Sequence, residues 1–314
     1  MTKIVPLERI LEALPDIDVV SEIERGFVAY SQGKVDVPPV GELLFPEANG
    51  ELHIKYGTVR GDDIFVVKLA TGFFDNPKSG LPPFSGCMLV LSAKTGQVNC
   101  VLLEEGELTN HRTAAAGAVV ARHMQPSGLT TIGICGSGVQ ARLQADYLRQ
   151  VTNCRELVLW GRDGEHAAAA ARDISRLGFD ARVVSSPAEV ASCAQLIVTT
   201  TSSHEPFLLA GDVKPGTHIT AMGSDTPGKR ELDPLLLKKA DMVVADSVEQ
   251  CLLRGEISAA VAAGLLDVEH VIELGNLISG SAGGHSRDVI TIADLTGVAV
   301  QDIMIAKAVV ARLV

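Results

Sequence analysis

Short apolar runs alternate with alanine-rich amphipathic stretches over the second half of the chain, and this pattern predicts repeated strand–helix units. The candidate strands are residues 131–135, 157–160, 181–184, 195–200, 217–222, 242–245 and 289–292. Helical periodicity fills most of the intervals between them. Repeated units of this kind favour an α/β fold with a doubly wound parallel sheet.

The first 120 residues follow a different pattern. A helical opening over residues 7–14 and 19–33 precedes apolar strands at 51–56 and 64–70, which indicates a strand-rich α+β domain that is not Rossmann-like. A helix over 112–123 then runs into Pro126-Ser-Gly, a plausible boundary. The last segment, 298–314, is helical in period and too short to stand alone. We therefore expect one domain of residues 1–120 plus 296–314 and a second of residues 121–295.

Length, charge and cysteine usage narrow the class of protein. The 314 residues are enough for two domains, and the formal net charge of −11 with dispersed charges argues against nucleic-acid or membrane partners. The six cysteines are far apart and form no metal-ligand spacing, so we expect reduced core thiols and no metal. The N-terminus lacks a signal-like segment, which favours a cytoplasmic enzyme that acts on small metabolites.

A glycine-rich turn carries the clearest chemistry. The segment from Thr131 to Arg142 is a predicted buried strand, a turn with Gly136 and Gly138, and a helix start in which Ala141 permits close packing. A second strand at 157–160 follows at the distance that a βαβ unit requires. The spacing predicts a dinucleotide pyrophosphate at the helix N-terminus, against the alternative of an ordinary strand-to-helix turn.

The position expected to bind the ribose is unusual. NAD sites place Asp or Glu about 20 residues beyond the glycines, but here the second strand ends in Gly161, Arg162 and Asp163. A glycine followed by an arginine would favour a 2′-phosphate, while Asp163 could still reach a ribose hydroxyl. Arg162 could equally be a solvated loop residue, so this pattern leaves NAD and NADP open.

Several separate motifs give the chain a resemblance to the ornithine cyclodeaminase/mu-crystallin family over essentially its full length. Besides the glycine loop, they are Val67-Lys68-Leu69, the 76–82 segment Asn-Pro-Lys-Ser-Gly-Leu-Pro, the 108–116 segment Leu-Thr-Asn-His-Arg-Thr-Ala-Ala-Ala, the Gly-Ser-Asp-Thr-Pro-Gly-Lys-Arg-Glu-Leu-Asp-Pro stretch from Gly223, and Thr296-Gly-Val-Ala-Val-Gln-Asp. Their order and spacing make a chance match improbable.

The resemblance implies a homodimer whose first domain binds the substrate and forms the dimer surface, while a Rossmann domain binds NAD or NADP. It implies hydride transfer between the nicotinamide and the α-carbon of an amino or imino acid. By motif match, Lys68 and Arg112 would bind the substrate carboxylate, and Asp225 would exchange a proton at nitrogen, so that Asp225 and Lys68 are the expected catalytic residues. Structural alternatives are a snorkelling Lys68, an Arg112 paired with Glu104 or Glu105, and an Asp225 that caps a turn.

The same resemblance assigns the cofactor-binding positions. They are Thr113, Gly136, Ser137, Gly138, Val139, Gln140, Gly161, Arg162, Asp163, Thr200, Thr201, Met222, Gly223, Ser224 and Val298.

One departure from the family pattern concerns the substrate. Many members carry a basic residue after a Pro-Pro pair, where this chain has Val40 followed by Gly41 and Glu42. His53 and Lys55 could partly replace this missing basic residue. They are two positions apart in a predicted strand, so both side chains point to the same face and are candidates for binding the substrate. The alternative is that this strand face is solvated.

We therefore expect NAD(P)H-dependent reduction of a small α-imino acid, with iminosuccinate to aspartate as the candidate because the site carries more cations than one carboxylate needs. An ornithine-type cyclodeaminase, which is a redox-neutral lyase with Glu42 holding a side-chain ammonium, is the second hypothesis. A mu-crystallin-like protein that binds cofactor and ligand without catalysis is the third.

Overall fold

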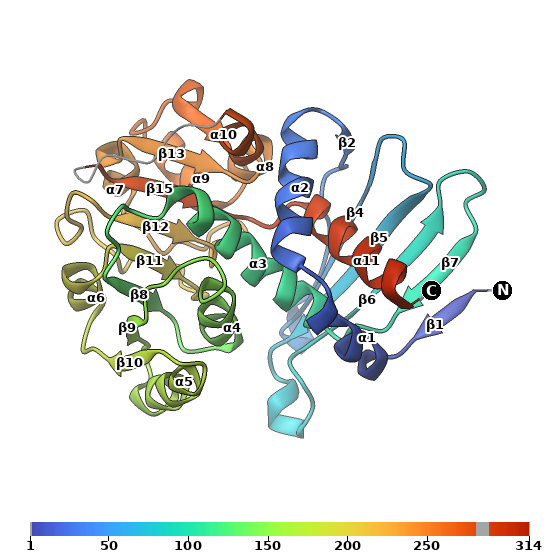
Figure 1. Cartoon of the computed structure of the whole chain (residues 1–314), viewed down its shortest axis with the longest axis horizontal. Coiled ribbons are helices and arrows are strands. Elements are labelled where there is room, and N and C mark those ends of the chain that lie inside the picture. Colours follow the sequence, from blue (N-terminus) through green and yellow to red (C-terminus); the bar gives the residue numbers. More distant parts are fainter. Residues whose placement is uncertain (1, 281–288, 314) are drawn as a thin grey trace. The chain divides into compact units, whose positions relative to one another are not determined.

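The computed structural model describes residues 2–280 and 289–313, and the chain divides into two compact units. The first unit comprises residues 1–112 and 298–314, and the second comprises residues 113–297. Both are visible in Figure 1, where the colours follow the chain.

The first unit is an α+β unit built on one mixed sheet. Its strands lie in the order β1-β7-β6-β5-β4-β2, with β3 also paired to β4. The strands are β1 (Lys3–Val5), β2 (Val35–Asp36), β3 (Gly41–Phe45), β4 (Gly50–Val59), β5 (Ile64–Phe73), β6 (Phe84–Ser92) and β7 (Val98–Leu102), and the helices are α1 (Leu7–Ala13), α2 (Val19–Ser31), α11 (Ala299–Leu313) and the start of α3 (Glu107–Met124). All neighbours are antiparallel except β1 and β7.

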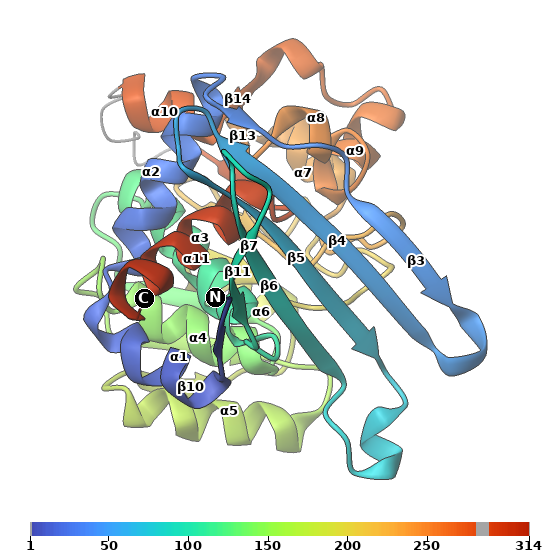
Figure 2. The same ribbon diagram turned by 90° about the vertical axis from the view of Figure 1, so that its right-hand side faces the viewer.

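Helix α11 joins the C-terminal segment to this sheet, and Figure 2 shows it crossing the long strands. It packs against α2, β4 and β5. Gly26 allows the close approach of α2, because a Cβ at this position would lie 2.7 Å from Met304 Cγ. Helix α2 itself begins where the Asp18 side chain accepts the Ser21 N–H at 3.0 Å, which caps its N-terminus.

The second unit is a parallel sheet in the strand order β10-β9-β8-β11-β12-β15-β13-β14. The strands are β8 (Thr131–Cys135), β9 (Glu156–Trp160), β10 (Asp180–Val183), β11 (Leu196–Thr199), β12 (His218–Ala221), β13 (Met242–Ala245), β14 (Val271–Glu273) and β15 (Thr291–Asp294). The helices are α4 (Val139–Leu148), α5 (Gly164–Arg176), α6 (Pro187–Cys193), α7 (Pro234–Lys239), α8 (Val248–Cys251), α9 (Gly255–Ala262) and α10 (Leu274–Gly280). The order reverses between β8 and β11, which is where doubly wound sheets bind their ligands.

One hydrophobic cluster covers a face of this sheet. It joins Val158, Ile197, Ile219, Val243 and Ile292 of the strands to apolar side chains of α6, α7 and α9. Strands buried in this way read as continuous apolar runs, which is why the sequence pattern located them.

The predicted α/β fold class is confirmed: a Rossmann-type parallel sheet accompanies a second α+β unit. Several details differ from the sequence pattern, among them the helix expected at 112–123, which begins at Glu107. The chain passes from the first compact unit to the second after Arg112, inside α3, where the unbroken helical periodicity of the sequence gives no sign of a boundary. The strand expected at 289–292 begins at Thr291, and β14, a three-residue edge strand, was not predicted.

Within residues 2–280 and 289–313, no helix combines the length and apolar character needed to span a membrane.

Candidate functional site

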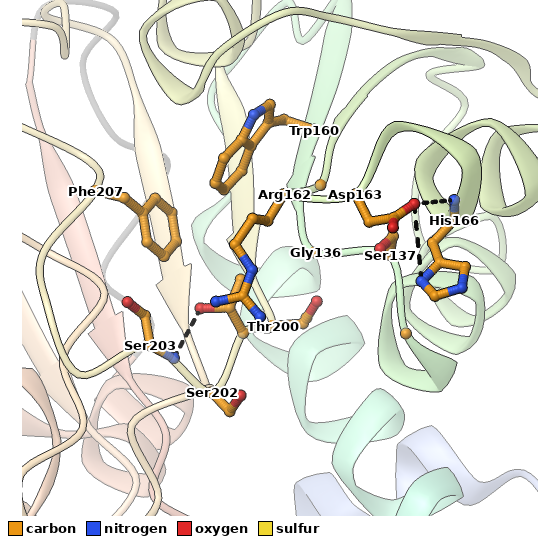
Figure 3. A pocket seen from close by; sticks show the side chains of 13 residues that line it. Gly136, Ser137, Trp160, Arg162, Asp163, His166, Thr200, Ser202, Ser203 and Phe207 are labelled. Carbon is orange, nitrogen blue, oxygen red and sulfur yellow. Dashed lines mark hydrogen bonds and ion pairs between the residues drawn. The ribbon is translucent and has the colours of Figure 1, made fainter.

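A pocket lies at the carboxyl ends of β8, β9 and β11, at the point where the strand order reverses (Figure 3). Its cavity volume is about 380 Å³. The lining residues are Gly136, Ser137, Gly138, Trp160, Gly161, Arg162, Asp163, His166, Thr200, Thr201, Ser202, Ser203 and Phe207. Many of these are positions that the sequence pattern assigned to a cofactor.

The glycine turn is shaped for a close approach of backbone and ligand. Gly136 has φ +135°, and a Cβ there would lie 2.2 Å from Thr200 Oγ1, so only glycine fits. Around Gly138, by contrast, a Cβ would meet nothing within 4 Å. Helix α4 begins at Val139 without a side-chain cap, and the positive end of its dipole at this first turn, which includes Gln140, favours an anion. These residues fit the pyrophosphate of a dinucleotide.

The loop after β9 closes against the glycine turn. A Cβ at Gly161 would lie 2.8 Å from Ser137 Oγ and 2.9 Å from Ser137 Cβ. Asp163 caps α5, because its Oδ1 accepts the His166 N–H at 2.9 Å, and this hydrogen bond helps to hold the pKa of Asp163 below its usual value. Arg162 is exposed at the pocket, and Figure 3 shows its side chain reaching toward Thr200 and Ser202.

Glu231, which sequence reasoning did not identify, holds together the loops after β11 and β12. Its Oε1 accepts the Thr201 N–H at 2.6 Å and the Thr201 hydroxyl at 2.7 Å, and its Oε2 accepts the Thr199 hydroxyl at 2.6 Å and the Gly223 N–H at 2.8 Å. Complete burial raises the pKa of Glu231 to about 7, although these donors act against the shift. Beside it, Thr200 donates its backbone N–H to Cys135 at 2.8 Å.

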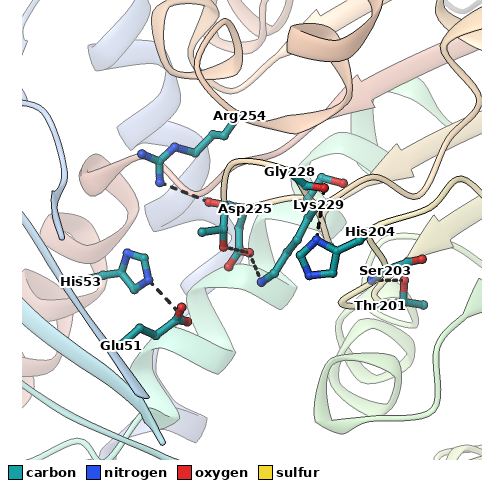
Figure 4. A network of polar contacts seen from close by, with 12 residues as sticks. Glu51, His53, Thr201, Ser203, His204, Asp225, Gly228, Lys229 and Arg254 are labelled. Carbon is teal, nitrogen blue, oxygen red and sulfur yellow. Dashed lines mark hydrogen bonds and ion pairs between the residues drawn. The ribbon is translucent and has the colours of Figure 1, made fainter. Parts of the chain in front are cut away.

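Asp225 follows in the loop after β12, and Figure 4 shows its contacts. Its Oδ1 accepts Lys229 Nζ at 2.8 Å and the Thr226 hydroxyl at 3.0 Å, and Arg254 Nη1 donates to the Asp225 carbonyl at 3.3 Å. The carboxylate is half exposed, with a side-chain exposure of 55%. The preceding Ser224 is buried, and its hydroxyl donates to the Glu256 carboxylate.

Gln144 connects several other predicted cofactor positions within the second unit. Its Nε2 lies 2.9 Å from Met222 Sδ, 3.3 Å from the Thr113 carbonyl and 3.4 Å from Gln140 Oε1. Val298, also predicted to contact the cofactor, is buried at the start of the last segment of the first unit.

The first unit contains a buried cluster of charges around Asp302. Lys68 Nζ donates to Asp302 Oδ1 at 2.9 Å, and Arg112 Nε lies 3.2 Å from the same oxygen. Arg112 Nη1 also donates to Gln301 Oε1 at 2.9 Å. In the β4–β5 register Lys55 is directly opposite Lys68, so three cations from β4, β5 and α3 converge on one carboxylate of α11.

Burial and charge set the protonation of this cluster. Desolvation lowers the pKa of Lys68, with Asp302 opposing the shift. For Asp302, burial acts to raise the pKa, but the charges of Lys68, Arg112 and Lys55 bring it below its usual value. Burial raises the pKa of nearby Glu104, against the charge of Lys68. Asp302 is therefore the firm anion among these groups.

The cluster leaves polar atoms without a hydrogen-bond partner. Asp302 Oδ2, Arg112 Nε and Glu104 Oε1 are buried and unsatisfied in this way. Buried polar atoms normally find partners, so these atoms mark a place where a polar ligand can complete the network. The donors of this cluster, Lys68 and Arg112, fit a carboxylate, whereas the two orphaned carboxylate oxygens accept and fit an N–H or O–H group.

His53 has different neighbours. Its Nε2 lies 3.5 Å from Glu51 Oε1 and its Nδ1 lies 3.8 Å from Glu42 Oε1, as Figure 4 shows for Glu51. The structure therefore brings Lys55, Lys68 and Arg112 together around Asp302 and surrounds His53 with carboxylates. The sequence signal for Gln301 and Asp302 is that they are two polar residues inside the apolar segment of α11.

Within residues 2–280 and 289–313, no three His, Cys, Asp or Glu side chains are placed to hold a metal ion.

Comparison with known proteins gives a consistent picture. A model of the ornithine cyclodeaminase/mu-crystallin family matches residues 5–314. An uncharacterised dehydrogenase of Rhizobium meliloti is 44% identical over 312 residues, which cover 98% of this chain and 92% of that protein.

Two solved structures are similar over nearly the whole chain. An archaeal alanine dehydrogenase dimer with bound NAD superposes with a TM-score of 0.90 at 32% identity, covering 99% of this chain and 95% of the other. The iminosuccinate reductase of Paracoccus denitrificans, in complex with NAD⁺, also gives 0.90, at 31% identity and with coverage of 98% and 95%.

Proposed function

The chain belongs to the ornithine cyclodeaminase/mu-crystallin family and is an NAD(P)-dependent oxidoreductase acting on C–N bonds, and we propose that it reduces a small α-imino acid to the α-amino acid. The candidate substrate is iminosuccinate, which would give aspartate. A similar structure is an iminosuccinate reductase, which supports this choice.

The observation that carries the proposal is the excess of positive charge around Asp302. Lys55, Lys68 and Arg112 face a single firmly ionised carboxylate. Buried cations need counter-charges, and a substrate carboxylate would supply one in a bidentate contact with the Arg112 guanidinium.

The remaining roles follow from the chemistry of imine reduction. NAD(P)H, when bound at the glycine turn, supplies the hydride that adds to the imine carbon. The imine nitrogen takes up a proton, so that C=N becomes CH–NH and the cofactor leaves oxidised. We assign the proton exchange at nitrogen to Asp225, which the Lys229 ammonium contacts at 2.8 Å. Lys68 and Arg112 would hold the carboxylate so that the C=N bond has one orientation.

A single observation favours a cyclodeaminase as the second candidate. Glu42 is directly opposite His53 in the β3–β4 register, and Glu51 is also close to that imidazole. Two carboxylates in one place could hold the side-chain ammonium of a diamino acid such as ornithine. That reaction would release ammonia without net consumption of the cofactor.

A spectrophotometric assay separates these candidates. NADH or NADPH is incubated with oxaloacetate, pyruvate, glyoxylate or pyrroline carboxylate, with ammonia or methylamine where an imine must form. We expect loss of nicotinamide absorbance with oxaloacetate plus ammonia, and aspartate as the product. No turnover with any of these substrates, together with ammonia release from ornithine and catalytic NAD, would replace the reductase by the cyclodeaminase. Nucleotide binding without either reaction would leave a ligand-binding protein.

We also propose that the chain forms a homodimer through the first unit. Leu43, Leu44 and Phe45 of β3 and Phe84 of β6 are large apolar side chains that are exposed, and exposed apolar side chains gathered on one unit are typical of an interface. The similar archaeal alanine dehydrogenase is a dimer. Light scattering after size exclusion would give twice the chain mass, whereas a monomer mass would overturn this part of the proposal.

A further inference from the structure

We propose that the pocket in the second unit selects a nucleotide with a 2′-phosphate, and that Arg162 is the residue that makes the selection. The protein would then use NADP(H) in preference to NAD(H). The inference rests on the proposed function only insofar as the same pocket receives the cofactor.

The first support is a steric exclusion at position 161. A carboxylate at the end of β9 would bind the ribose hydroxyls of NAD and repel a 2′-phosphate. Position 161 cannot carry one, because even a Cβ would lie 2.8 Å from Ser137 Oγ and 2.9 Å from Ser137 Cβ. Packing against the glycine turn therefore removes the group that normally recognises NAD.

The second support is that the neighbouring carboxylate is already engaged. Asp163 Oδ1 accepts the His166 N–H at 2.9 Å and caps α5, a helix of 13 residues. A rotation of Asp163 onto a ribose would leave that N–H without its partner, at the cost that loss of a helix cap carries. The cap therefore keeps the negative charge of Asp163 in its own helix turn.

The third support is the state of Arg162. Its side chain is exposed at the pocket, and it makes no ion pair within the part of the chain that the structure describes. Figure 3 shows the guanidinium directed across the pocket, away from the Asp163 carboxylate. An unpaired guanidinium can give a phosphate two parallel hydrogen bonds. Ser137 and His166 also line the pocket, on the side where Figure 3 shows Asp163.

The pocket also contains a reporter for a binding experiment. Trp160 is the only tryptophan in the chain, and its ring lies 5.4 Å from the Phe207 ring, measured between centroids. Both side chains line the cavity. Ligands that enter the pocket should therefore change the intrinsic fluorescence, and binding can be followed without any imine or turnover.

The test is a fluorescence titration with 2′,5′-ADP, 3′,5′-ADP and 5′-AMP. The two bisphosphates have the same groups and nearly equal charge, so a difference between them reports the position of the phosphate. We expect 2′,5′-ADP to bind on the order of 10- to 100-fold more tightly than either other ligand, as one charge-assisted contact would give. Arg162→Ala should remove that preference and leave 5′-AMP affinity within about twofold. The control Arg182→Ala, at an exposed arginine that pairs with Glu189 instead, should change neither affinity.

The outcomes are distinct. Equal affinities for the three ligands, tighter binding of 5′-AMP, or an Arg162→Ala variant that weakens all three equally would overturn the inference. A lack of binding by every ligand would overturn both the inference and the assignment of the pocket. A clear preference for 2′,5′-ADP with no imine reduction would support the inference while the proposed reaction fails.

Discussion

The backbone N–H of Gly223 donates to Glu231 Oε2 at 2.8 Å, and the two residues are packed so closely that a Cβ at position 223 would lie 2.5 Å from Glu231 Cδ. The same Cβ would lie 2.1 Å from the Thr201 carbonyl oxygen. The loops after β11 and β12 are thus joined through a buried carboxylate for which only glycine leaves room. This arrangement fixes the backbone just before Asp225.

We expect Gly223→Ala to reduce the free energy of unfolding by about 1–3 kcal/mol, because the added methyl group forces the two loops apart. Gly211→Ala is the matched control: neither glycine has a positive φ, and a Cβ at 211 would meet nothing within 4 Å. Urea denaturation should show a large effect at 223 and a change within about 0.5 kcal/mol at 211. Equal effects at the two sites would show that the close packing is not energetically important.

Glu231→Gln tests the hydrogen bonds of the same carboxylate. Each carboxylate oxygen accepts one backbone N–H, from Thr201 or from Gly223. The amide nitrogen of Gln cannot accept, so one N–H must lose its partner in either orientation of the side chain. At pH 6 we expect a loss of about 1–3 kcal/mol in the free energy of unfolding, measured in urea. A variant as stable as the wild type at this pH would exclude the pairing described above.

The pair of Lys68 and Asp302 should respond asymmetrically to substitution. Asp302→Asn leaves Lys68, Arg112 and Lys55 without their common anion, and we expect a loss of about 3–5 kcal/mol in the free energy of unfolding. Lys68→Met removes one of three cations, and Arg112 remains beside Asp302, so its cost should be clearly smaller.

Lys68→Met should have a large effect on kinetics, although its effect on the free energy of unfolding is the smaller of the two. The variant should raise KM for the imino acid at least tenfold and leave the dissociation constant of the nucleotide unchanged, because Lys68 belongs to the proposed carboxylate site alone. If KM stays at the wild-type value, Lys68 has only a structural role in pairing with Asp302.

Much of the fold could be predicted from sequence because parallel strands and their covering helices have strong apolar periodicity. The glycine turn could also be predicted, because the turn needs Gly136 and Gly138 for its local backbone geometry and the spacing of these glycines in the sequence indicates it. Asp302 and Glu231 were missed for a physical reason: their importance comes from partners distant in the chain, such as Lys68, 234 positions away. The steric reason for Gly161 also depends on such a contact, with Ser137, and no local pattern contains it.

The last prediction concerns the pH dependence that Glu231 gives to stability. Its pKa in the folded protein is raised from 4.5 to about 7, so the folded state binds the proton more tightly than the unfolded state. The stability that this provides is fully present below the unfolded-state pKa and is lost as the pH rises through about 7. The whole shift corresponds to about 3 kcal/mol, of which about 1–1.5 kcal/mol is lost between pH 6 and pH 8.

A protonated Glu231 remains compatible with its neighbours, because a carboxylic O–H can donate to a threonine hydroxyl while the same oxygen accepts an N–H. The measurement is the difference in the free energy of unfolding between wild type and Glu231→Gln, taken from pH 6 to pH 8. Other buried carboxyls, such as Glu256 and Asp294, also have raised pKa values because of burial, but they contribute to both proteins and largely cancel in the difference. We expect the stability advantage of the wild type to shrink by about 1–1.5 kcal/mol over this range. A difference that is constant with pH would mean that Glu231 does not change its protonation state near neutrality.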